Sequence, residues 1–322
     1  MRYMLRTPVC ELLGISVPVV CAPFGPWDQV QLAAEVCEAG GMGSLGTAVR
    51  SLPQLREQWN SLRGLTARPF AVNHTMRPFD EEAFAATLEE RPAAVSFHLA
   101  VPADLIARAH DAGILWIQQV SDVRQATSAL ESGADVLVAQ GGEAGGHSGD
   151  VATMVLVPQV VDLAGQTPVL AAGGIADGRG LAAALTLGAQ GVVMGTRFLA
   201  SHEMNVSHSW KQRIIESDGT DAVKVVNSDR VMPPFSRPDG FGVPRSLRTP
   251  LVDMLRDNPE LVDSAEASSR LLNAVIEGRG DEDMPFTGQS AGLIHDVLPA
   301  REIVTRMLRE AEDALRRVDS FR

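Results

Sequence analysis

The strongest constraint on the fold is a regular alternation of short apolar runs and helix-patterned segments through the first 200 residues. Eight runs are rich in β-branched residues, as buried strands of a parallel sheet are: 17–24, 42–47, 69–76, 93–100, 114–120, 135–141, 168–174 and 191–199. Between them, apolar residues recur at helical spacing in 28–39, 51–62, 80–90, 103–112, 122–132, 154–164 and 177–187. Eight strands, each followed by a helix, predict an α/β fold of the (β/α)₈ TIM-barrel type.

Local signals at the helix ends agree with this repeat. Ser51 and Gln54 have the spacing of a capping box, and Gly40, Gly113, Gly133 and Gly188 follow helices as C-cap glycines do. The competing fold is a doubly wound open sheet, which would usually place a GxGxxG turn after its first strand. Here the first strand is followed by APFGPW, so the barrel is favoured.

The alternation ends after Ser201. We expect 1–201 to form the barrel, a helix within 202–217 to complete it, and 218–300 to form a smaller, mostly helical C-terminal cap or lid. The stretch 218–250 is rich in Pro, Arg, Ser and Gly and is interpreted as an extended lid or linker. In 301–322 one apolar stripe predicts an amphipathic helix that packs back on the barrel, formed by Ile303, Val304, Met307, Leu308, Ala311 and Leu315.

Composition narrows the class of function. A net charge of −12 and a pI near 5.1 argue against nucleic-acid or anionic-membrane partners, although acidity also simply keeps a protein soluble. Lysine occurs only at Lys211 and Lys224, so no barrel lysine can form a Schiff base. Three cysteines without CxxC spacing predict neither a disulfide framework nor a metal site, and the N-terminus shows no long apolar leader. We therefore expect a cytoplasmic protein.

The polar residues that could carry chemistry follow the predicted strands. The active site of a TIM barrel lies at the C-terminal ends of its strands. Residues at those ends are Ala22, Pro23, Phe24, Asn73, His74, Ser96, His98, Gln118, Gln119 and Gln140. The sixth strand continues into the loop GGEAGGHSG, where glycines allow close approach to a flat or anionic ligand and His147 is a candidate proton-transfer group.

Two glycine-bearing turns predict a phosphate site. Gly173-Gly174 follows the seventh strand and Met194-Gly195-Thr196 follows the eighth, the positions at which barrels commonly bind phosphate through backbone N–H groups. Each glycine-bearing turn could also be only a tight turn. Together with the amides of Asn73 and Gln140, which suit the edge of a flavin ring, the turns favour a phosphorylated planar cofactor.

These motifs resemble the nitronate monooxygenase (2-nitropropane dioxygenase) family. The resemblance rests on AQGGEAGGHSG, TMVLVPQVVDLAGQTPVLAAGGIADGRG and GAQGVVMGTRFLAS, with LLGISVPVVCAPFG and MPFTGQSAGLI near the two ends. It implies a barrel with a helical cap, FMN held without a covalent bond, and oxidation of alkyl nitronates with O₂ to a carbonyl compound and nitrite.

The resemblance also assigns residues. It implies FMN contacts from Asn73 and Gln140, from Gly145 with Gly146 beside it, from Gly174 with Gly173 beside it, and from the phosphate turn Val193, Met194, Gly195 and Thr196. It makes His147 the catalytic base or acid. The family often has QAPM where this chain has Cys21-Ala22-Pro23-Phe24, so Phe24 changes the wall against the flavin.

Other readings stay open from the sequence. Flavin-dependent enoyl-acyl-carrier-protein reductases and quinone reductases are very similar, and in them NAD(P)H reduces FMN; Arg237, Arg245 or Arg248 would then meet a nucleotide phosphate, or be ordinary surface arginines. A barrel that binds FMN or a sugar phosphate without redox turnover is a further alternative. The expected partners are O₂ and a small substrate, and the protein is expected to be a monomer or a homodimer.

Overall fold

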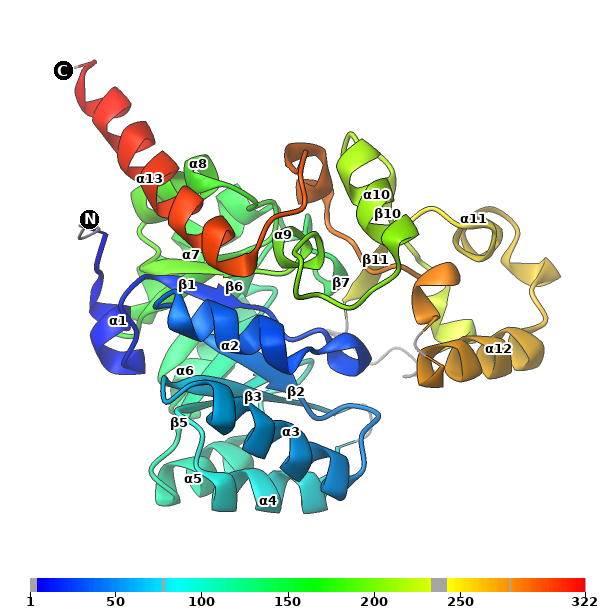
Figure 1. Ribbon diagram of the computed structural model, residues 1–322, viewed down its shortest axis with the longest axis horizontal. Helices are drawn as coiled ribbons and strands as arrows, with labels where there is room; N and C mark the ends of the chain where they lie inside the picture. The colour runs from blue at the N-terminus through cyan, green and yellow to red at the C-terminus, as the bar shows by residue number, and fades with distance from the viewer. Residues whose placement is uncertain (1–4, 77–78, 233–241, 278, 322) are drawn as a thin grey trace.

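A closed barrel of eight parallel strands forms the body of the molecule (Figure 1). The computed structural model describes residues 5–76, 79–232, 242–277 and 279–321. The strands are β1 (Val19–Cys21), β2 (Gly43–Gly46), β3 (Phe70–Thr75), β4 (Ala94–His98), β5 (Leu115–Val120), β6 (Val136–Gln140), β8 (Val169–Ala172) and β9 (Gly191–Met194). They neighbour one another in the order β1-β9-β8-β6-β5-β4-β3-β2.

Hydrogen bonds between the first and last strands of this order close the barrel. Val20 pairs with Met42, the Cys21 N–H donates to the Met42 carbonyl at 2.9 Å, and the Met42 N–H donates to Val19 at 3.0 Å. All eight predicted strands are present, and the choice of a barrel over an open sheet is confirmed.

The eighth strand, predicted over 191–199, is shorter in the structure. β9 ends at Met194, and α9 (Thr196–Leu199) begins at once, with Phe198 and Leu199 buried. A short buried apolar run has no polar face, so its periodicity cannot distinguish a strand from a helix.

Helices surround the barrel as the alternation predicts. They are α2 (Val30–Glu38), α3 (Leu52–Leu65), α4 (Glu81–Glu90), α5 (Ala103–Asp111), α6 (Val123–Glu131), α7 (Thr153–Ala164) and α8 (Gly178–Thr186). One core lies between strands and helices, and a second lies inside the barrel, built from residues such as Val20, Ala71, Ile117 and Val136. At the predicted capping box, Gln54 Oε1 accepts from the Ser51 N–H at 2.8 Å.

A short helix that the sequence analysis did not predict, α1 (Pro8–Leu13), packs into the interior core. Val9, Cys10 and Leu13 belong to the same cluster as the inward residues of the strands. Thr7 and Val9 bind Gln190, the residue just before β9, so α1 covers the N-terminal end of the barrel.

The helix that completes the outer ring comes from the C-terminus. The predicted segment 202–217 contains α10 (His208–Glu216), which contacts η5 (Gln289–Leu293). α13 (Ala300–Asp319) packs mainly against α8, with further contacts to α2 and α9 (Figure 1). It therefore lies between the helices that follow the seventh and first barrel strands, the place assigned above to 202–217.

The cap contains a small sheet as well as helices. α11 (Pro250–Asp257) and α12 (Ser264–Ile276) lie to one side of the barrel, with η2 (Ser228–Arg230), η3 (Pro259–Leu261) and η4 (Gly280–Glu282). The sheet joins β10 (Ala222–Lys224), β11 (Val243–Leu247) and β7 (Gly146–Ser148) in the antiparallel order β10-β11-β7.

The segment 218–250, expected to be an extended lid or linker, therefore contributes two strands to this sheet where the structure describes it; 233–241 lies outside the described residues. β11 forms because its partner β7 is supplied by the glycine loop about a hundred residues earlier, and no local pattern reveals such a partner. None of the helices within the described ranges is both long and apolar enough to span a bilayer.

Candidate functional site

Amide side chains form a belt on the inner face of four neighbouring strands. Asn73 of β3 donates through Nδ2 to Ser96 O at 3.1 Å and Ser96 Oγ at 3.0 Å. Gln119 of β5 donates through Nε2 to Gln140 Oε1 at 3.0 Å. Asn73 and Gln140 are both only 8% exposed. Asn73 Oδ1 and Gln140 Nε2 have no hydrogen-bond partner among the described residues, so an acceptor and a donor remain for a ligand.

Two of the polar residues proposed for this belt point away from it. His74 packs edge-on to Phe84 of α4, and its ring bonds the hydroxyls of Thr47 and Thr87. Gln118 accepts from Trp116 Nε1 at 3.0 Å and donates to backbone carbonyls. Successive strand side chains alternate between the two faces, so Asn73 and Gln119 face inward while their neighbours His74 and Gln118 face the helices.

The glycine loop after β6 is held by its own glutamate. The Glu143 carboxylate accepts from the Thr153 N–H at 2.9 Å and from Thr153 Oγ1 at 2.8 Å. This confirms the expectation that Glu143 is a structural acceptor. The glycines allow tight packing: a Cβ on Gly141 would lie 2.0 Å from Thr153 Oγ1, and one on Gly145 would lie 2.7 Å from the Gly288 nitrogen.

His147 lies in β7, paired with Pro244 of β11. Its ring meets the edge of Phe286, with centroids 6.1 Å apart. From the neighbouring position on β11, Arg245 donates to Gly142 O at 2.8 Å and to Ala222 O at 2.6 Å. The pairing of β7 with β11 and the contact with Phe286 thus fix the position of His147.

Arg245 is therefore not placed to bind a nucleotide phosphate, because it is 9% exposed and bonded to backbone carbonyls. Arg248 is exposed and paired with Asp253 at 2.6 Å. Arg237 lies outside the described residues.

The turn after β8 has a backbone conformation that favours glycine. Gly173 and Gly174 both have positive φ, 95° and 72°. The N-terminus of α8 is closed, however: Asp177 accepts from the N–H groups of Arg179 and Gly180, and Glu310 accepts from Gly178. Two carboxylates at this helix end exclude a phosphate there, so any anion must be held nearer the two glycines and the β9 turn.

The β9 turn brings several predicted residues together. A Cβ on Gly195 would lie 3.7 Å from Ala22 Cβ and 3.9 Å from Phe24 Cε1. Thr196 Oγ1 accepts from the Gly288 N–H at 2.9 Å. Met194 is 1% exposed, belongs to the outer core and accepts through its carbonyl from the Ala22 N–H at 2.8 Å, whereas Val193 packs against the interior core.

A buried ion pair holds the loop after β1, which carries Ala22, Pro23 and Phe24. Asp28 accepts from the N–H groups of Phe24 and Gly46, both at 2.6 Å, and Arg50 lies 3.8 Å away. Burial raises the pKa of Asp28 to about 6, opposed by the Arg50 charge. Arg50 also donates to Gly25 O at 2.7 Å, so the pair joins the loops after β1 and β2.

The segment 284–289 belongs to a motif that carries the family resemblance, but the sequence analysis does not predict a place for it in the site. It nevertheless connects the loops of the site: Gly288 binds Thr196, and Gln289 N–H donates to Glu143 O at 2.9 Å. Phe286 packs edge-on against both His147 and Trp27. The conspicuous MPFTGQSAG stretch is the signal that could have identified this segment.

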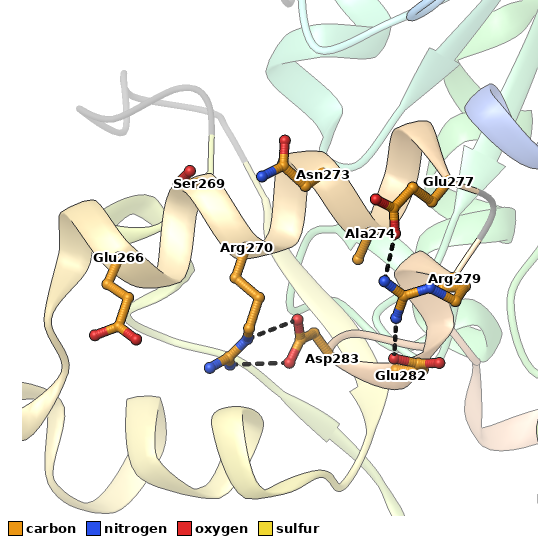
Figure 2. A pocket seen from close by; sticks show the side chains of 9 residues that line it. All are labelled: Glu266, Ser269, Arg270, Asn273, Ala274, Glu277, Arg279, Glu282 and Asp283. Carbon is orange, nitrogen blue, oxygen red and sulfur yellow. Dashed lines mark hydrogen bonds and ion pairs between the residues drawn. The ribbon is translucent and has the colours of Figure 1, made fainter.

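A hollow of about 680 Å³ lies elsewhere, between α12 and η4 (Figure 2). Two ion-pair groups line it: Arg270 binds Asp283, and Arg279 binds Glu277 and Glu282. Because none of its lining residues belongs to a barrel strand end, we place the candidate site at the strand ends instead.

Comparison with known proteins agrees with this geometry. A family model described as nitronate monooxygenase matches residues 6–82 and 79–310. A Mycobacterium tuberculosis protein named (3aS,4S,5R,7aS)-5-hydroxy-7a-methyl-1-oxo-octahydro-1H-indene-4-carboxyl-CoA dehydrogenase is 32% identical over 95% of this chain and 96% of that protein. A nitronate monooxygenase of Paraburkholderia phytofirmans is 29% identical over 98% of both chains.

Among solved structures, FabK from Thermotoga maritima superposes with a TM-score of 0.88 at 34% identity, over 99% of this chain and 100% of that one. The matched family is named for an oxidoreductase activity. The match across nearly the whole chain shows that this enzyme belongs to the nitronate monooxygenase family.

Proposed function

We propose that the strand-end site binds FMN without a covalent bond and that His147 moves a proton at the substrate carbon. The observation that carries the proposal is the pair of unsatisfied polar atoms, Asn73 Oδ1 and Gln140 Nε2, on side chains 8% exposed. An acceptor and a donor on one belt match the alternating acceptors and N–H donor along the edge of an isoalloxazine ring.

The glycine turns support the same cofactor. Positive φ at Gly173 and Gly174, and the absence of a side chain at Gly195, leave room for a phosphate against backbone N–H groups. Gly145, Gly146, Val193 and Thr196 complete the proposed cradle. Met194 would contribute only backbone atoms.

The finer proposal for the reaction is oxidation of an alkyl nitronate with O₂ to a carbonyl compound and nitrite. When bound, FMN supplies an electron acceptor that O₂ reoxidises. His147 takes the α-proton of a neutral nitroalkane, or orients the nitronate that forms in solution. Phe24 and Phe286 present apolar rings near this site and exclude water from the reacting carbon.

A second reaction is a dehydrogenase or reductase reaction on an acyl thioester, using the same flavin and the same histidine. It is supported by the 32% identity to the CoA-linked dehydrogenase and by the 34% identity to FabK. Phe24, in place of a methionine that the family often has, also gives the flavin wall a different shape.

His147→Ala tests the proposed role of the histidine. The variant should keep its flavin, while turnover of a neutral nitroalkane falls by about 10²–10⁴-fold, the usual contribution of general acid–base catalysis. A preformed nitronate needs no proton abstraction and should be turned over much closer to the wild-type rate. Wild-type turnover of the neutral substrate by this variant would show that the assignment is wrong.

Anaerobic mixing separates the two reactions. Bleaching of the flavin absorbance by a nitronate, without an effect of NADH or NADPH, supports nitronate oxidation. Bleaching by a reduced nicotinamide, or by a CoA thioester with an oxidisable carbon, supports the second reaction. A purified protein that carries no flavin and binds none would contradict both.

A further inference from the structure

Four oxygens of the described residues form a cage around the ammonium group of Lys224. Lys224, the last residue of β10, donates through Nζ to Ser148 O at 2.7 Å, Ser148 Oγ at 2.7 Å, Gly149 O at 2.9 Å and Val243 O at 3.0 Å. Its side chain is 17% exposed. The Asp150 carboxylate is 4.0 Å away and 91% exposed, so it is a weak and solvated neighbour.

This arrangement depends on a positive charge. Three carbonyl oxygens converge on one point, and their partial negative charges repel one another unless a cation lies between them. Ser148 belongs to β7 and Val243 to β11, so the lysine reaches from the first strand of the small sheet to the third. An ammonium has three donors and suits such a cage, whereas the planar fork of arginine does not.

The cage lies immediately after His147 in the chain. Lys224 holds Ser148 and Gly149, while Arg245, which is paired with Lys224 in the β10–β11 ladder, holds Gly142 at the start of the same loop. Two cations of one hairpin thus restrain both ends of the loop that carries His147. Tight packing supports this: a Cβ on Gly242 would lie 2.3 Å from Ser148 O.

We infer that Lys224 is a positioning residue, which acts as a built-in monovalent cation to fix β7 and thereby the His147 imidazole at the rim of the barrel. The inference rests on the proposed role of His147. It implies that the charge matters more than the side-chain stem, so a small cation that carbonyl oxygens can coordinate should replace the ammonium once the side chain is removed.

Lys224→Ala in the flavin-loaded enzyme tests this. In lithium or choline chloride, turnover should fall by about tenfold or more, because charge-assisted hydrogen bonds are lost at a mostly buried group. Ammonium or potassium chloride should restore most of the loss. Amide hydrogen exchange at Ser148 and Gly149 should speed up in lithium and slow again in potassium; this readout does not depend on catalysis.

Three variants serve as controls. Lys211→Ala removes the other lysine, which donates to Ser201 O from α10, and should show no dependence on the cation. Lys224→Met keeps the stem in the cage without the charge and should not be rescued. Gly242→Ala displaces Ser148 sterically, and its loss should be equal in all salts.

The outcomes separate the two proposals. If Lys224→Ala shows cation-dependent exchange while His147→Ala retains full turnover, the cage is supported and the catalytic role of His147 fails. Wild-type turnover and exchange of Lys224→Ala in every salt, or a loss that neither ammonium nor potassium changes, would overturn the inference. If the variant folds poorly, its melting temperature in potassium against lithium chloride decides the question in the same way.

Discussion

Adjacent residues on one strand have opposite environments in this protein. Asn73 faces the interior belt, whereas His74 is 1% exposed among helix residues and bonds two threonine hydroxyls. Burial lowers the pKa of His74 to about 4, because the charged imidazolium would lose its hydration. His74 is therefore a structural residue that stays neutral where the protein is stable.

His74 should make the protein sensitive to acid. Its ordinary pKa of 6.5 applies to the unfolded chain, so between pH 6.5 and about 4 the unfolded chain binds a proton that the folded chain does not. Stability is therefore lost as the pH falls through this range, by up to about 3 kcal/mol. His74→Leu should remove this part of the pH dependence, since without the imidazole the hydroxyls of Thr47 and Thr87 can donate to the carbonyls of Asn73 and Ala83.

Urea unfolding of both proteins between pH 4.5 and 7 measures the effect. The difference between their unfolding free energies should grow as the pH falls, in favour of the variant. Parallel pH profiles would show that His74 does not titrate in this way.

At the scale of elements, the site is assembled where loops from distant parts of the chain meet. The glycine loop after β6, the β9 turn and the segment 287–289 interlock through the Gly288–Thr196 and Gln289–Glu143 hydrogen bonds. A side chain at Gly145 would separate two of them, since its Cβ would lie 2.7 Å from Gly288 N and 2.8 Å from Thr287 C. Both are backbone atoms and cannot rotate away.

Gly145→Ala should therefore destabilise the protein by about 1–3 kcal/mol, the usual cost of overpacking, and weaken flavin retention. Gly64→Ala is the matched control, because Gly64 lies in α3 with nothing within 4 Å of the added Cβ. There the substitution should stabilise by up to about 1 kcal/mol through helix propensity. Denaturant midpoints compare the two, and a Gly145→Ala protein as stable as the wild type would contradict the proposed packing.

At the scale of the whole molecule, the last helix of the chain completes the outer ring of the barrel. α13 buries Ile303, Val304, Met307 and Leu308, and its backbone approaches α8 so closely that a Cβ on Gly178 would lie 2.3 Å from Ala311 N. The buried Arg197 fixes the chain segment that precedes α13, because it binds both the side chain and the carbonyl of Asp296.

Removal of 300–322 should leave a chain that does not fold. Burial of the four large apolar side chains contributes about 6–12 kcal/mol, which is comparable to the total stability of a typical domain. Removal of only 316–322 should change stability little, because residues 316–321 are exposed. Soluble yield and circular dichroism of the two truncations test this. A well-folded chain that lacks 300–322 would show that α13 is dispensable.

Elements that form locally could be predicted from the residue pattern. Helical and strand periodicity, C-cap glycines and the order of the apolar runs predict eight βα units, and the glycine-rich turns place Gln140, Gly145, Gly174, Gly195 and His147 at strand ends. These features depend on near neighbours in the chain, so a single sequence contains them.

The way in which distant segments combine could not be predicted and is known only from the folded molecule. The β7–β11 pairing, the four-oxygen cage of Lys224, the place of α13 beside α8 and the inward face of Asn73 each depend on partners far away in the chain. Such contacts are selected by burial and by the satisfaction of backbone polar groups across the whole molecule. Such contacts produce no periodic pattern of apolar residues in the two segments that form them.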